Sequence, residues 1–469
     1  MRCFVENHPA ESFDVVVIGA GVIGCAVARR FVLEGARVLL LEKGADILSG
    51  ASKGNSAILH TGFDAPPGSL EVACMQAGYE EYMAIVSRMN LAVLETGAIV
   101  AAWNDEEVAK LDGIEAQALE NGVSDVRRVT REEILQREPH INPNVRAGLL
   151  VPREHVIDPW SAPLGYLTQA VQNGAQAVFD AEVKTAARVG GEWIVQTTKG
   201  EFRASFAVNC AGLFGDQVEQ VFLGKASFEI RPRKGQFVVF DKPAASLIRT
   251  ILLPVPTERT KGVVVVRTAF GNVLVGPTAE EQEDRIHAGV DETTLKGLVA
   301  KAAELVPALG EVPVNAIYAG LRPATEKKEY RVQIDAVRGY ITLGGIRSTG
   351  LTAALGLAQH AFRLYSNAGA RVIPLANPVW PQMPNLSEHR ERDWERPGDN
   401  EIVCHCELVT RREIESALNS SVPARDFGGL RRRTRACMGR CQGFYCSARV
   451  AEITKGRFEN PLSVGVSHE

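Results

Sequence analysis

The strongest constraint on the fold lies near the start of the chain, in "FDVVVIGAGVIGCAVARRFVLEGARVLLLEKG". Residues 13–18 are rich in Val and Ile, as expected of a strand buried in a parallel sheet. Glycines at GxGxxG spacing follow, and apolar residues then recur at helical intervals over residues 22–33. Gly35 ends that helix, and residues 37–41 predict a second strand. This order predicts the βαβ unit that opens a doubly wound α/β domain.

The glycines and a following acid predict that this unit binds a dinucleotide. Gly19 permits a tight turn, Gly21 lets the backbone approach a pyrophosphate, and Gly24 lets the helix pack on the strand. Glu42 comes 18 residues after Gly24, where a carboxylate can accept hydrogen bonds from a ribose diol. The helix N-terminus favours the phosphates. The alternative is a glycine-rich turn in an unrelated α/β sheet.

Length and composition exclude several classes of protein. A chain of 469 residues with 45% apolar and 23% charged residues predicts two or three globular domains. A formal net charge of −4 gives no reason to expect nucleic acid or an anionic membrane as the main partner. The start lacks a basic segment followed by an apolar core, and glycines and arginines interrupt the longest apolar stretch, residues 15–33. We therefore expect no membrane span and a cytoplasmic location, with attachment to an inner membrane only through a partner.

The remaining pattern predicts a second, β-rich region and a separate tail. Five prolines in residues 374–397 predict a linker or a covering strap before a tail domain that begins near Glu401. The elements expected between the opening unit and the strap are a largely helical insertion over about 78–143, a helix ending at Gly174, strands at 178–183 and 206–210, a β-rich stretch over 230–275, a helix at 295–305, strands near Ala316 and Val332, and a strand, glycine loop and helix over 339–365.

The tail carries five of the nine cysteines in the chain. Cys404 and Cys406 form a C-x-C pair, and Cys441 and Cys446 follow with four residues between them. Clustered cysteines in a cytosolic setting more often bind metal than form disulfides. Four thiolates suit either zinc or an iron–sulfur cluster, and ligand chemistry alone leaves both open, together with an empty site.

The tail sequence "CHCELVTRREIESAL…TRACMGRCQGFYC" resembles the bacterioferritin-associated-ferredoxin-like [2Fe–2S] domain. It is most similar to the version fused to anaerobic glycerol-3-phosphate dehydrogenases. The resemblance implies a [2Fe–2S] cluster held by Cys404, Cys406, Cys441 and Cys446. The position of Cys437 is commonly glycine in that family, so the resemblance leaves Cys437 outside the ligand set.

The first 370 or so residues resemble the FAD-dependent amino-acid-oxidase and glycerol-3-phosphate-dehydrogenase superfamily. The resemblance is carried by the opening glycine motif, by "VNCAG" at 208–212 and by "GGIRSTGLTAALG" at 344–356. The segment "GNSAILHTGFDAPPGSLEV", residues 54–72, is more specific and is similar to L-2-hydroxyglutarate dehydrogenases and glycerol-3-phosphate oxidases. "KGVVVVRTAFGNVLVGPTAEE" and "YAGLRPAT" match the same branch.

This resemblance implies an α/β fold, in part α+β, with a Rossmann-like FAD-binding domain interwoven with an antiparallel-sheet substrate domain, plus the small helical iron–sulfur domain. The implied FAD-binding parts are about 12–75, 145–225 and 330–370, the substrate-domain parts about 76–144 and 226–329, the linker 374–400 and the cluster domain 401–469. The implied FAD contacts are Gly19, Gly21, Gly24, Glu42, Asn55, Ser56, Val183, Gly212, Gly345, Gly350 and Leu351.

Three residues are candidates for catalysis. His60 lies where relatives pass beside the flavin ring, and an imidazole can act as a general base or hold the substrate oxygen. Its alternative is a histidine that only packs against the flavin. Arg322 matches the arginine near the substrate anion in the family, and a guanidinium pairs bidentately with carboxylate or phosphate. Its alternative is a structural ion pair. Arg347 lies close to the flavin contacts and equally suits a helix cap.

These observations predict an FAD-dependent dehydrogenase that oxidises a small anionic alcohol. Our best candidate is sn-glycerol 3-phosphate, oxidised to dihydroxyacetone phosphate, with electrons passed through the [2Fe–2S] cluster to a redox partner protein or a quinone-linked subunit. The alternatives are an L-2-hydroxy-acid or amine/opine dehydrogenase, and an electron-transfer or scaffold subunit without catalysis. Either a hetero- or a homo-oligomer is compatible with the sequence.

Overall fold

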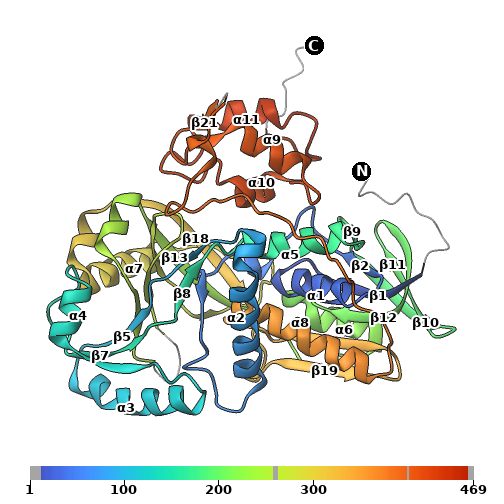
Figure 1. Cartoon of the computed structure of the whole chain (residues 1–469), viewed down its shortest axis with the longest axis horizontal. Helices are drawn as coiled ribbons and strands as arrows, with labels where there is room; N and C mark the ends of the chain where they lie inside the picture. Colours follow the sequence, from blue (N-terminus) through green and yellow to red (C-terminus); the bar gives the residue numbers. More distant parts are fainter. Residues whose placement is uncertain (1–11, 257–261, 399–400, 463–469) are drawn as a thin grey trace.

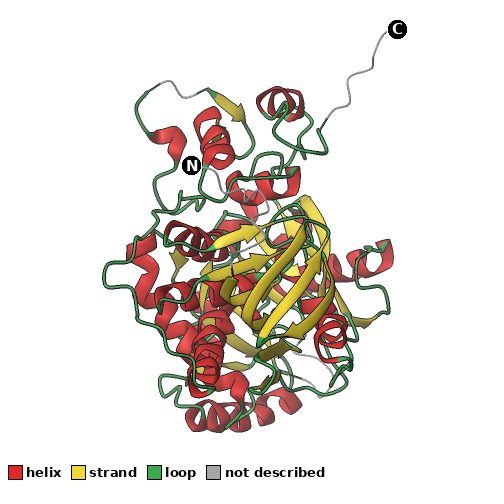
Figure 2. Ribbon diagram, turned by 90° about the vertical axis from the view of Figure 1, so that its right-hand side faces the viewer, coloured by secondary structure: helices red, strands yellow, loops and turns green. Residues whose placement is uncertain are grey.

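A computed structural model describes residues 12–256, 262–398 and 401–462. A large body holds two β-sheets with their helices, and a small, mainly helical tail lies on one side of it (Figure 1). Figure 2 shows the sheets side on, with helices packed around them and the tail above. The expected α/β class, with an additional antiparallel sheet, is confirmed.

The first sheet has a parallel centre. Its strand order is β10-β11-β12-β1-β2-β9, with β20 beside β12 and β19 beside β20. The central pairs of β1 with β2 and with β12 are parallel. The strands are β1 (Ser12–Ile18), β2 (Val38–Leu41), β9 (Gln176–Val178), β10 (Val183–Val189), β11 (Glu192–Thr197), β12 (Gly200–Asn209), β19 (Arg331–Asp335) and β20 (Tyr340–Gly344).

Helices cover both faces of this sheet. Side chains alternate along β1, so that Val15 and Val17 face one core while Val16 and Ile18 face the other. The first core is filled by α1, α2, α5 and α8, and the second by α6. These helices are α1 (Val22–Leu33), α2 (Leu70–Met89), α5 (Ser161–Gln172), α6 (Gly215–Leu223) and α8 (Gly350–Asn367).

Two expected strands differ in detail from the structure. Residues 178–183 do not form one strand, because β9 ends at Val178 and β10 begins at Val183. Asp180 between them has a left-handed backbone with φ 55°, which breaks the extended chain. Residues 206–209 are the end of the longer strand β12, and Cys210 follows it.

The second sheet is mostly antiparallel and has the order β17-β13-β16-β15-β14-β5-β7-β6, with β18 beside β13. Strand β7 of this sheet lies inside the part expected to bind FAD, 145–225. Helix α2 packs in the core of the first sheet and crosses the boundary expected at residue 75. The strands are β5 (Ala98–Ala102), β6 (Arg127–Thr130), β7 (Ala147–Val151), β13 (Arg233–Phe240), β14 (Ile251–Pro254), β15 (Val264–Arg267), β16 (Val273–Gly276), β17 (Glu280–Glu281) and β18 (Val314–Arg322). The helices beside it are α3 (Asp105–Glu120), α4 (Arg131–Arg137) and α7 (Glu292–Leu305).

A small sheet joins distant segments near the centre of the body. Its order is β3-β8-β4, formed by β3 (Ile58–Leu59), β8 (His155–Ile157) and β4 (Val93–Leu94). In its register Ile58 lies opposite Val156 and Leu59 opposite His155. This pairing brings the segment that contains His60 beside the turn that precedes β8.

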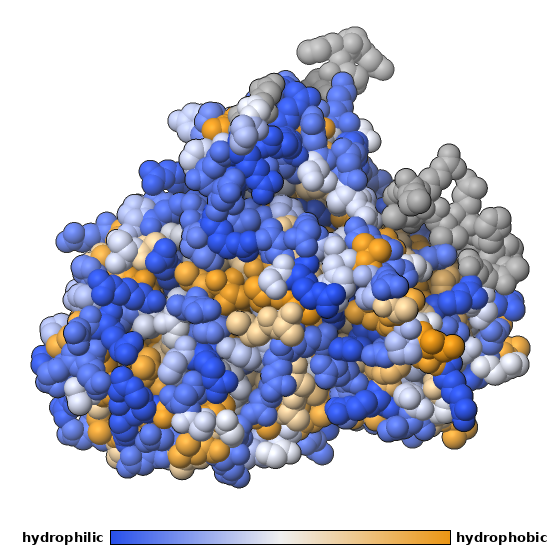
Figure 3. Space-filling view, in the orientation of Figure 1, coloured by the Kyte–Doolittle hydropathy of each residue, from blue (hydrophilic) through white to orange (hydrophobic). Residues whose placement is uncertain are grey.

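The proline-rich segment is a strap that follows the body before it reaches the tail. Its backbone N–H groups donate to the carbonyl oxygens of Leu33, Met89 and Ala269 at 2.9 Å each, from Leu375, Met383 and Glu388. The tail then has its own apolar core, formed by β21 (Ile402–Cys404), β22 (Val409–Thr410), α9 (Arg411–Asn419), α10 (Phe427–Thr434) and α11 (Ser447–Ile453). The outer surface of the tail is largely hydrophilic (Figure 3). Across the described residues, none of the helices has the length and apolarity that a membrane span requires.

Candidate functional site

A cavity of about 1000 Å³ lies between the two large sheets. Its lining contains the three catalytic candidates His60, Arg322 and Arg347 and every expected FAD contact except Gly24. The FAD contacts on its wall are Gly19, Gly21, Glu42, Asn55, Ser56, Val183, Gly212, Gly345, Gly350 and Leu351. The fold therefore brings together residues that are as much as 332 positions apart in the sequence.

The turn before α1 requires glycine, because side chains there would collide with the neighbouring backbone. Gly19 has φ +104°, and a Cβ there would lie 2.7 Å from the carbonyl oxygen of Cys210. Gly24 lies behind the wall, where a Cβ would lie 1.8 Å from the carbonyl oxygen of Gly19. Gly21 is the N-cap residue of α1 and provides no side-chain cap, and the first turn of the helix contains no acid. Such a start suits a pyrophosphate, because backbone N–H groups and the helix dipole both favour an anion.

Glu42 is held in place at the end of β2. Its carboxylate oxygens accept hydrogen bonds from the backbone N–H groups of Ala20, at 2.6 Å, and Gly44, at 2.7 Å. Burial raises the pKa of Glu42 above its ordinary value. Each carboxylate oxygen still has a lone pair for a ribose hydroxyl, so the residue fits the role that its spacing predicts.

Asn55 and Ser56 belong to the loop that crosses the start of α1. The side chain of Asn55 is committed to its own loop, since it donates to the carbonyl of Ser52 at 3.1 Å and accepts from the N–H of Ala57 at 2.8 Å. The hydroxyl of Ser52 in turn accepts from the N–H of Val22 at 3.1 Å. Asn55 therefore shapes the cavity wall through the loop rather than through a free amide.

His60 is oriented by a carboxylate that the sequence did not single out. Its Nδ1 lies 2.7 Å from Oε2 of Glu154, and its backbone N–H donates to the hydroxyl of Thr352 at 3.0 Å. The other oxygen of Glu154 accepts from the N–H of Thr61, at 2.6 Å, and from its hydroxyl, at 2.8 Å. Glu154 is fully buried. With Nδ1 committed to Glu154, Nε2 is the ring nitrogen left for a substrate.

Arg322 is a partly buried cation on the cavity wall. Its guanidinium donates to the carbonyl of Thr278 at 3.3 Å, and among the described residues no carboxylate forms an ion pair with it. Burial, followed by the charge of Arg233, lowers the pKa of Arg322 to about 10, so it remains a cation at neutral pH. Gly235 on the facing strand makes room, since a Cβ there would lie 2.6 Å from Nη2 of Arg322. An anion at this position would offset both the cost of burying the Arg322 guanidinium and its repulsion by Arg233.

Arg347 is less available. It donates to the carbonyl of Lys328 and lies 3.9 Å from a carboxylate oxygen of Glu71. Glu71 also accepts a hydrogen bond of 2.7 Å from the hydroxyl of Thr349 at the start of α8. Arg347 therefore lines the cavity while its charge is partly balanced by a neighbouring acid.

The tail cysteines gather at one end of its core. Cys406 and Cys441 lie close enough for each to shift the pKa of the other, and the same is true of Cys404 and Cys446. Cys437 also lies here, with its Sγ 3.4 Å from Sγ of Cys446. Among the described residues no three His, Cys, Asp or Glu side chains close around a single ion. Pairs of thiols are the arrangement that a binuclear cluster requires, since its four ligands are divided between two irons.

The thiol surroundings differ within the group. Burial raises the pKa of Cys404 and of Cys446 to about 11. The backbone N–H of Tyr445, with those of Gly443 and Phe444, lowers the pKa of Cys441 by donating to its sulfur. Gly439 leaves room for the C-x-C pair, because a Cβ there would lie 2.3 Å from Cβ of Cys406. Backbone groups of the loop between 437 and 446, rather than bulky side chains, therefore surround the sulfurs.

Helix α10 attaches the tail to the cofactor side of the body. Arg433 forms a bidentate pair with Asp46 at 2.8 and 2.9 Å, and both side chains are almost completely buried. Arg432 donates to the carbonyl of Ile47, and Arg425 to that of Ala45, both at 2.9 Å. These three arginines bind residues 45–47, which come shortly after Glu42 on the cavity wall.

A second contact runs from the cavity wall to the cysteine loops. The indole N–H of Trp160 donates to the carbonyl of Lys53 on that wall at 3.4 Å, and the Trp160 ring stacks on Phe270 with centroids 5.5 Å apart. The guanidinium of Arg435 lies 4.1 Å from the centroid of Phe270 and pairs with Glu407 at 2.8 Å. Glu407 directly follows Cys406.

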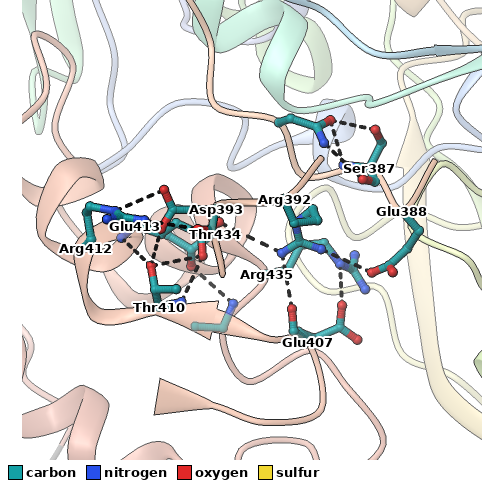
Figure 4. Close-up of polar contacts among 12 residues, drawn as sticks. Ser387, Glu388, Arg392, Asp393, Glu407, Thr410, Arg412, Glu413, Thr434 and Arg435 are labelled. Carbon is teal, nitrogen blue, oxygen red and sulfur yellow. Dashed lines mark hydrogen bonds and ion pairs between the residues drawn. The ribbon is translucent and has the colours of Figure 1, made fainter. Parts of the chain in front are cut away.

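The end of the strap is tied into the same region. Figure 4 shows Arg392 and Arg435 converging on Glu407, with Glu388 on the other side of Arg392. In a neighbouring network Asp393 accepts from Thr410 at 2.6 Å and from Arg412 at 3.1 Å. The strap is therefore the element that fixes both the cysteine loops and the start of α9.

Two family models match the chain. Residues 14–364 match the FAD dependent oxidoreductase family, and residues 402–455 match the BFD-like [2Fe-2S] binding domain. The tail therefore carries a [2Fe–2S] cluster rather than zinc.

Relatives cover both parts. A glycerol 3-phosphate dehydrogenase of Caloramator mitchellensis is 32% identical over 453 residues, 94% of this chain and 93% of the relative. One component of the anaerobic glycerol-3-phosphate dehydrogenase of Haemophilus influenzae is 24% identical over 97% of this chain and 86% of its own. The solved structure of L-alpha-glycerophosphate oxidase from Mycoplasma pneumoniae, with FAD bound, has a TM-score of 0.72 and 27% identity, and covers 78% of this chain and 97% of that one.

The family match and the cavity agree on the cofactor. The glycine wall, the held carboxylate of Glu42 and the loop at 52–56 suit FAD, and the family model that spans them describes FAD-dependent enzymes. The chain belongs to the FAD dependent oxidoreductase family, with a BFD-like [2Fe–2S] domain at its tail.

Proposed function

We propose that this protein oxidises sn-glycerol 3-phosphate to dihydroxyacetone phosphate and passes the electrons through its [2Fe–2S] cluster to a partner redox protein or quinone-linked subunit. The observation that carries the substrate is Arg322, a partly buried cation in the cavity with no carboxylate partner among the described residues. The names of the relatives support a phosphorylated alcohol. In this proposal Arg322 binds the phosphate.

The residues around the cavity suit removal of the hydroxyl proton. His60 accepts that proton at Nε2, since Nδ1 is held by Glu154. Glu154 is a positioning residue, which fixes the ring and balances the charge of the protonated imidazole. Bound FAD supplies the acceptor for the hydride that leaves the carbon bearing this hydroxyl group. Arg347 then contributes to the shape of the wall, with its charge shared by Glu71.

Contacts between body and tail support the relay. Trp160, Phe270 and Arg435 form a continuous packed path from Lys53 on the cavity wall to the loop after Cys406. We assign Cys404, Cys406, Cys441 and Cys446 as the ordinary cluster ligands. Because a cluster accepts single electrons, an acceptor that takes one electron at a time suits this arrangement.

A substrate screen under anaerobic conditions tests the proposal. Purified protein, mixed with sn-glycerol 3-phosphate, should lose the absorbance of its oxidised flavin, whereas glycerol should leave it unchanged. L-2-hydroxyglutarate is the matched competitor, because its carboxylates could also pair with Arg322. Bleaching by the hydroxy acid and not by the phosphate would reverse the substrate assignment.

A further inference from the structure

The tail holds five thiols where a [2Fe–2S] cluster uses four. They form an outer pair and an inner group of three. Cys406 and Cys441 make the outer pair, and both are partly exposed. The inner group is Cys404, Cys437 and Cys446, each no more than 4% exposed.

Within the inner group, Cys446 has two thiol neighbours. Its Sγ lies 3.4 Å from Sγ of Cys437, and the thiol of Cys404 lies close enough to interact with it. Two thiolates that share one tetrahedral metal at about 2.3 Å must lie roughly 3.8 Å apart. The observed separation of 3.4 Å between the sulfurs of Cys437 and Cys446 is close to this value.

The local backbone holds Cys437 in this position. Cys437 has a left-handed backbone with φ 61°, which turns the chain just before the loop that carries Cys441. Gly443 lies against it, and a Cβ at Gly443 would lie 3.3 Å from the sulfur of Cys437. The thiol is therefore enclosed among the sulfurs of the group, and it is not a side chain placed at the tail surface.

We propose that Cys437 is a reserve ligand of the cluster, able to bind the iron shared with Cys446 in place of Cys404. Either Cys404 or Cys437 completes that iron. The thiol that binds releases its proton, and the other keeps its own. Among the described residues the outer pair has no such substitute, because the sulfur–sulfur hydrogen bond of Cys437 is with Cys446. The inference rests on the [2Fe–2S] assignment of the tail.

The test compares two cysteines of the same C-x-C pair in the full-length protein, purified and reconstituted anaerobically. Cys404→Ser should keep about two iron and two sulfide atoms per chain, because Cys437 takes the vacant place. Cys406→Ser and the double variant Cys404→Ser/Cys437→Ser should each lose the cluster at least about fivefold, because serine is a hard ligand. The reduced cluster of Cys404→Ser should also give electron paramagnetic resonance g-values different from those of the wild type.

Three results would overturn the inference. The first is a Cys404→Ser variant with as little iron as Cys406→Ser. The second is a double variant that keeps its cluster. Wild-type protein without iron would overturn the cluster assignment together with the reserve ligand, which separates that failure from the first two. Cys437→Ser gives an independent measurement that does not remove an ordinary ligand. It should keep its iron with shifted g-values, and a spectrum that superimposes on the wild type would place Cys437 away from the cluster.

Discussion

At the scale of single residues, the candidate site contains side chains that the sequence could predict and one that it could not. Arg322 and His60 could be predicted because they stand in short motifs that resemble known enzymes. Glu154 could not, because it lies 94 residues from His60 in a turn whose sequence, "VPREHV", looks like an exposed loop. Only the pairing of β3 with β8 brings its carboxylate to the imidazole.

Replacing Arg322 tests the anion site. We expect Arg322→Ala to lower kcat/KM for sn-glycerol 3-phosphate by roughly 30- to 1000-fold, since a charge-assisted bidentate pair is worth on the order of 2–4 kcal/mol. Arg322→Lys should lose less, because it keeps the charge but not the fork. Steady-state kinetics with bound FAD measured in parallel give the comparison. Arg231→Ala is the control, since that arginine is exposed and, within the described parts of the chain, forms its ion pair with Glu229. Unchanged kinetics in Arg322→Ala would remove it from the site.

Replacing Glu154 tests the orientation of His60. In Glu154→Gln the neutral amide no longer balances a protonated imidazole, so the rate of flavin reduction at saturating substrate should fall about 10- to 100-fold. KM should change much less. Glu138→Gln is the matched control, because Glu138 is an equally buried carboxylate that accepts backbone N–H groups of Arg249 and Thr250. Equal losses of rate in both variants would mean that Glu154 acts only on stability.

At the scale of elements, local patterns predicted what local forces decide. The opening strand, glycine turn and helix lie where they were expected. They could be predicted because burial periodicity and helix stop signals depend on residues that are neighbours in the sequence. Strand pairing across the second sheet could not be predicted, because register depends on residues far apart in the chain. The attachment of α10 was also missed. A run of arginines is usually solvated, and nothing local shows that Arg433 meets Asp46.

The buried pair between α10 and the body should dominate the attachment of the tail. Asp46→Asn leaves the guanidinium of Arg433 buried without its partner, and we expect a loss of about 3–5 kcal/mol of stability. Asp180→Asn, which removes the partly exposed partner of Arg425, should cost no more than about 1 kcal/mol. Denaturant unfolding of the protein with its cofactors bound, with proteolytic cleavage of the tail as the readout, measures the loss of stability in both variants. Equal and small effects would mean that other contacts hold the tail.

At the scale of the whole molecule, the protein combines an FAD-dependent oxidoreductase body and a [2Fe–2S] domain in one chain. The strap runs along the body and ends in the network around Glu407, so the cysteine loops are held against the second sheet rather than tethered loosely. The sequence predicted the two parts and the segment between them. It could not predict the path through Trp160 and Phe270, because neither aromatic stands near a cysteine or a glycine motif.

Removing the cluster should separate the two halves of the reaction. Cys441→Ser replaces a soft thiolate of the outer pair and should lose the iron. Substrate should still bleach the flavin at a near-normal rate, because the oxidation site is in the body. Turnover with a protein acceptor should fall, while small dyes that reach the flavin should still be reduced. Full turnover with the protein acceptor after loss of iron would make the tail a structural element only.

The most direct measurement is anaerobic mixing of wild-type protein with sn-glycerol 3-phosphate, with flavin absorbance and the paramagnetic signal of the reduced cluster followed in the same samples. Our account predicts that the flavin bleaches first, and that the cluster signal then appears faster than overall turnover. The account would be contradicted if this substrate left the flavin oxidised, or if the flavin bleached completely while the cluster stayed oxidised.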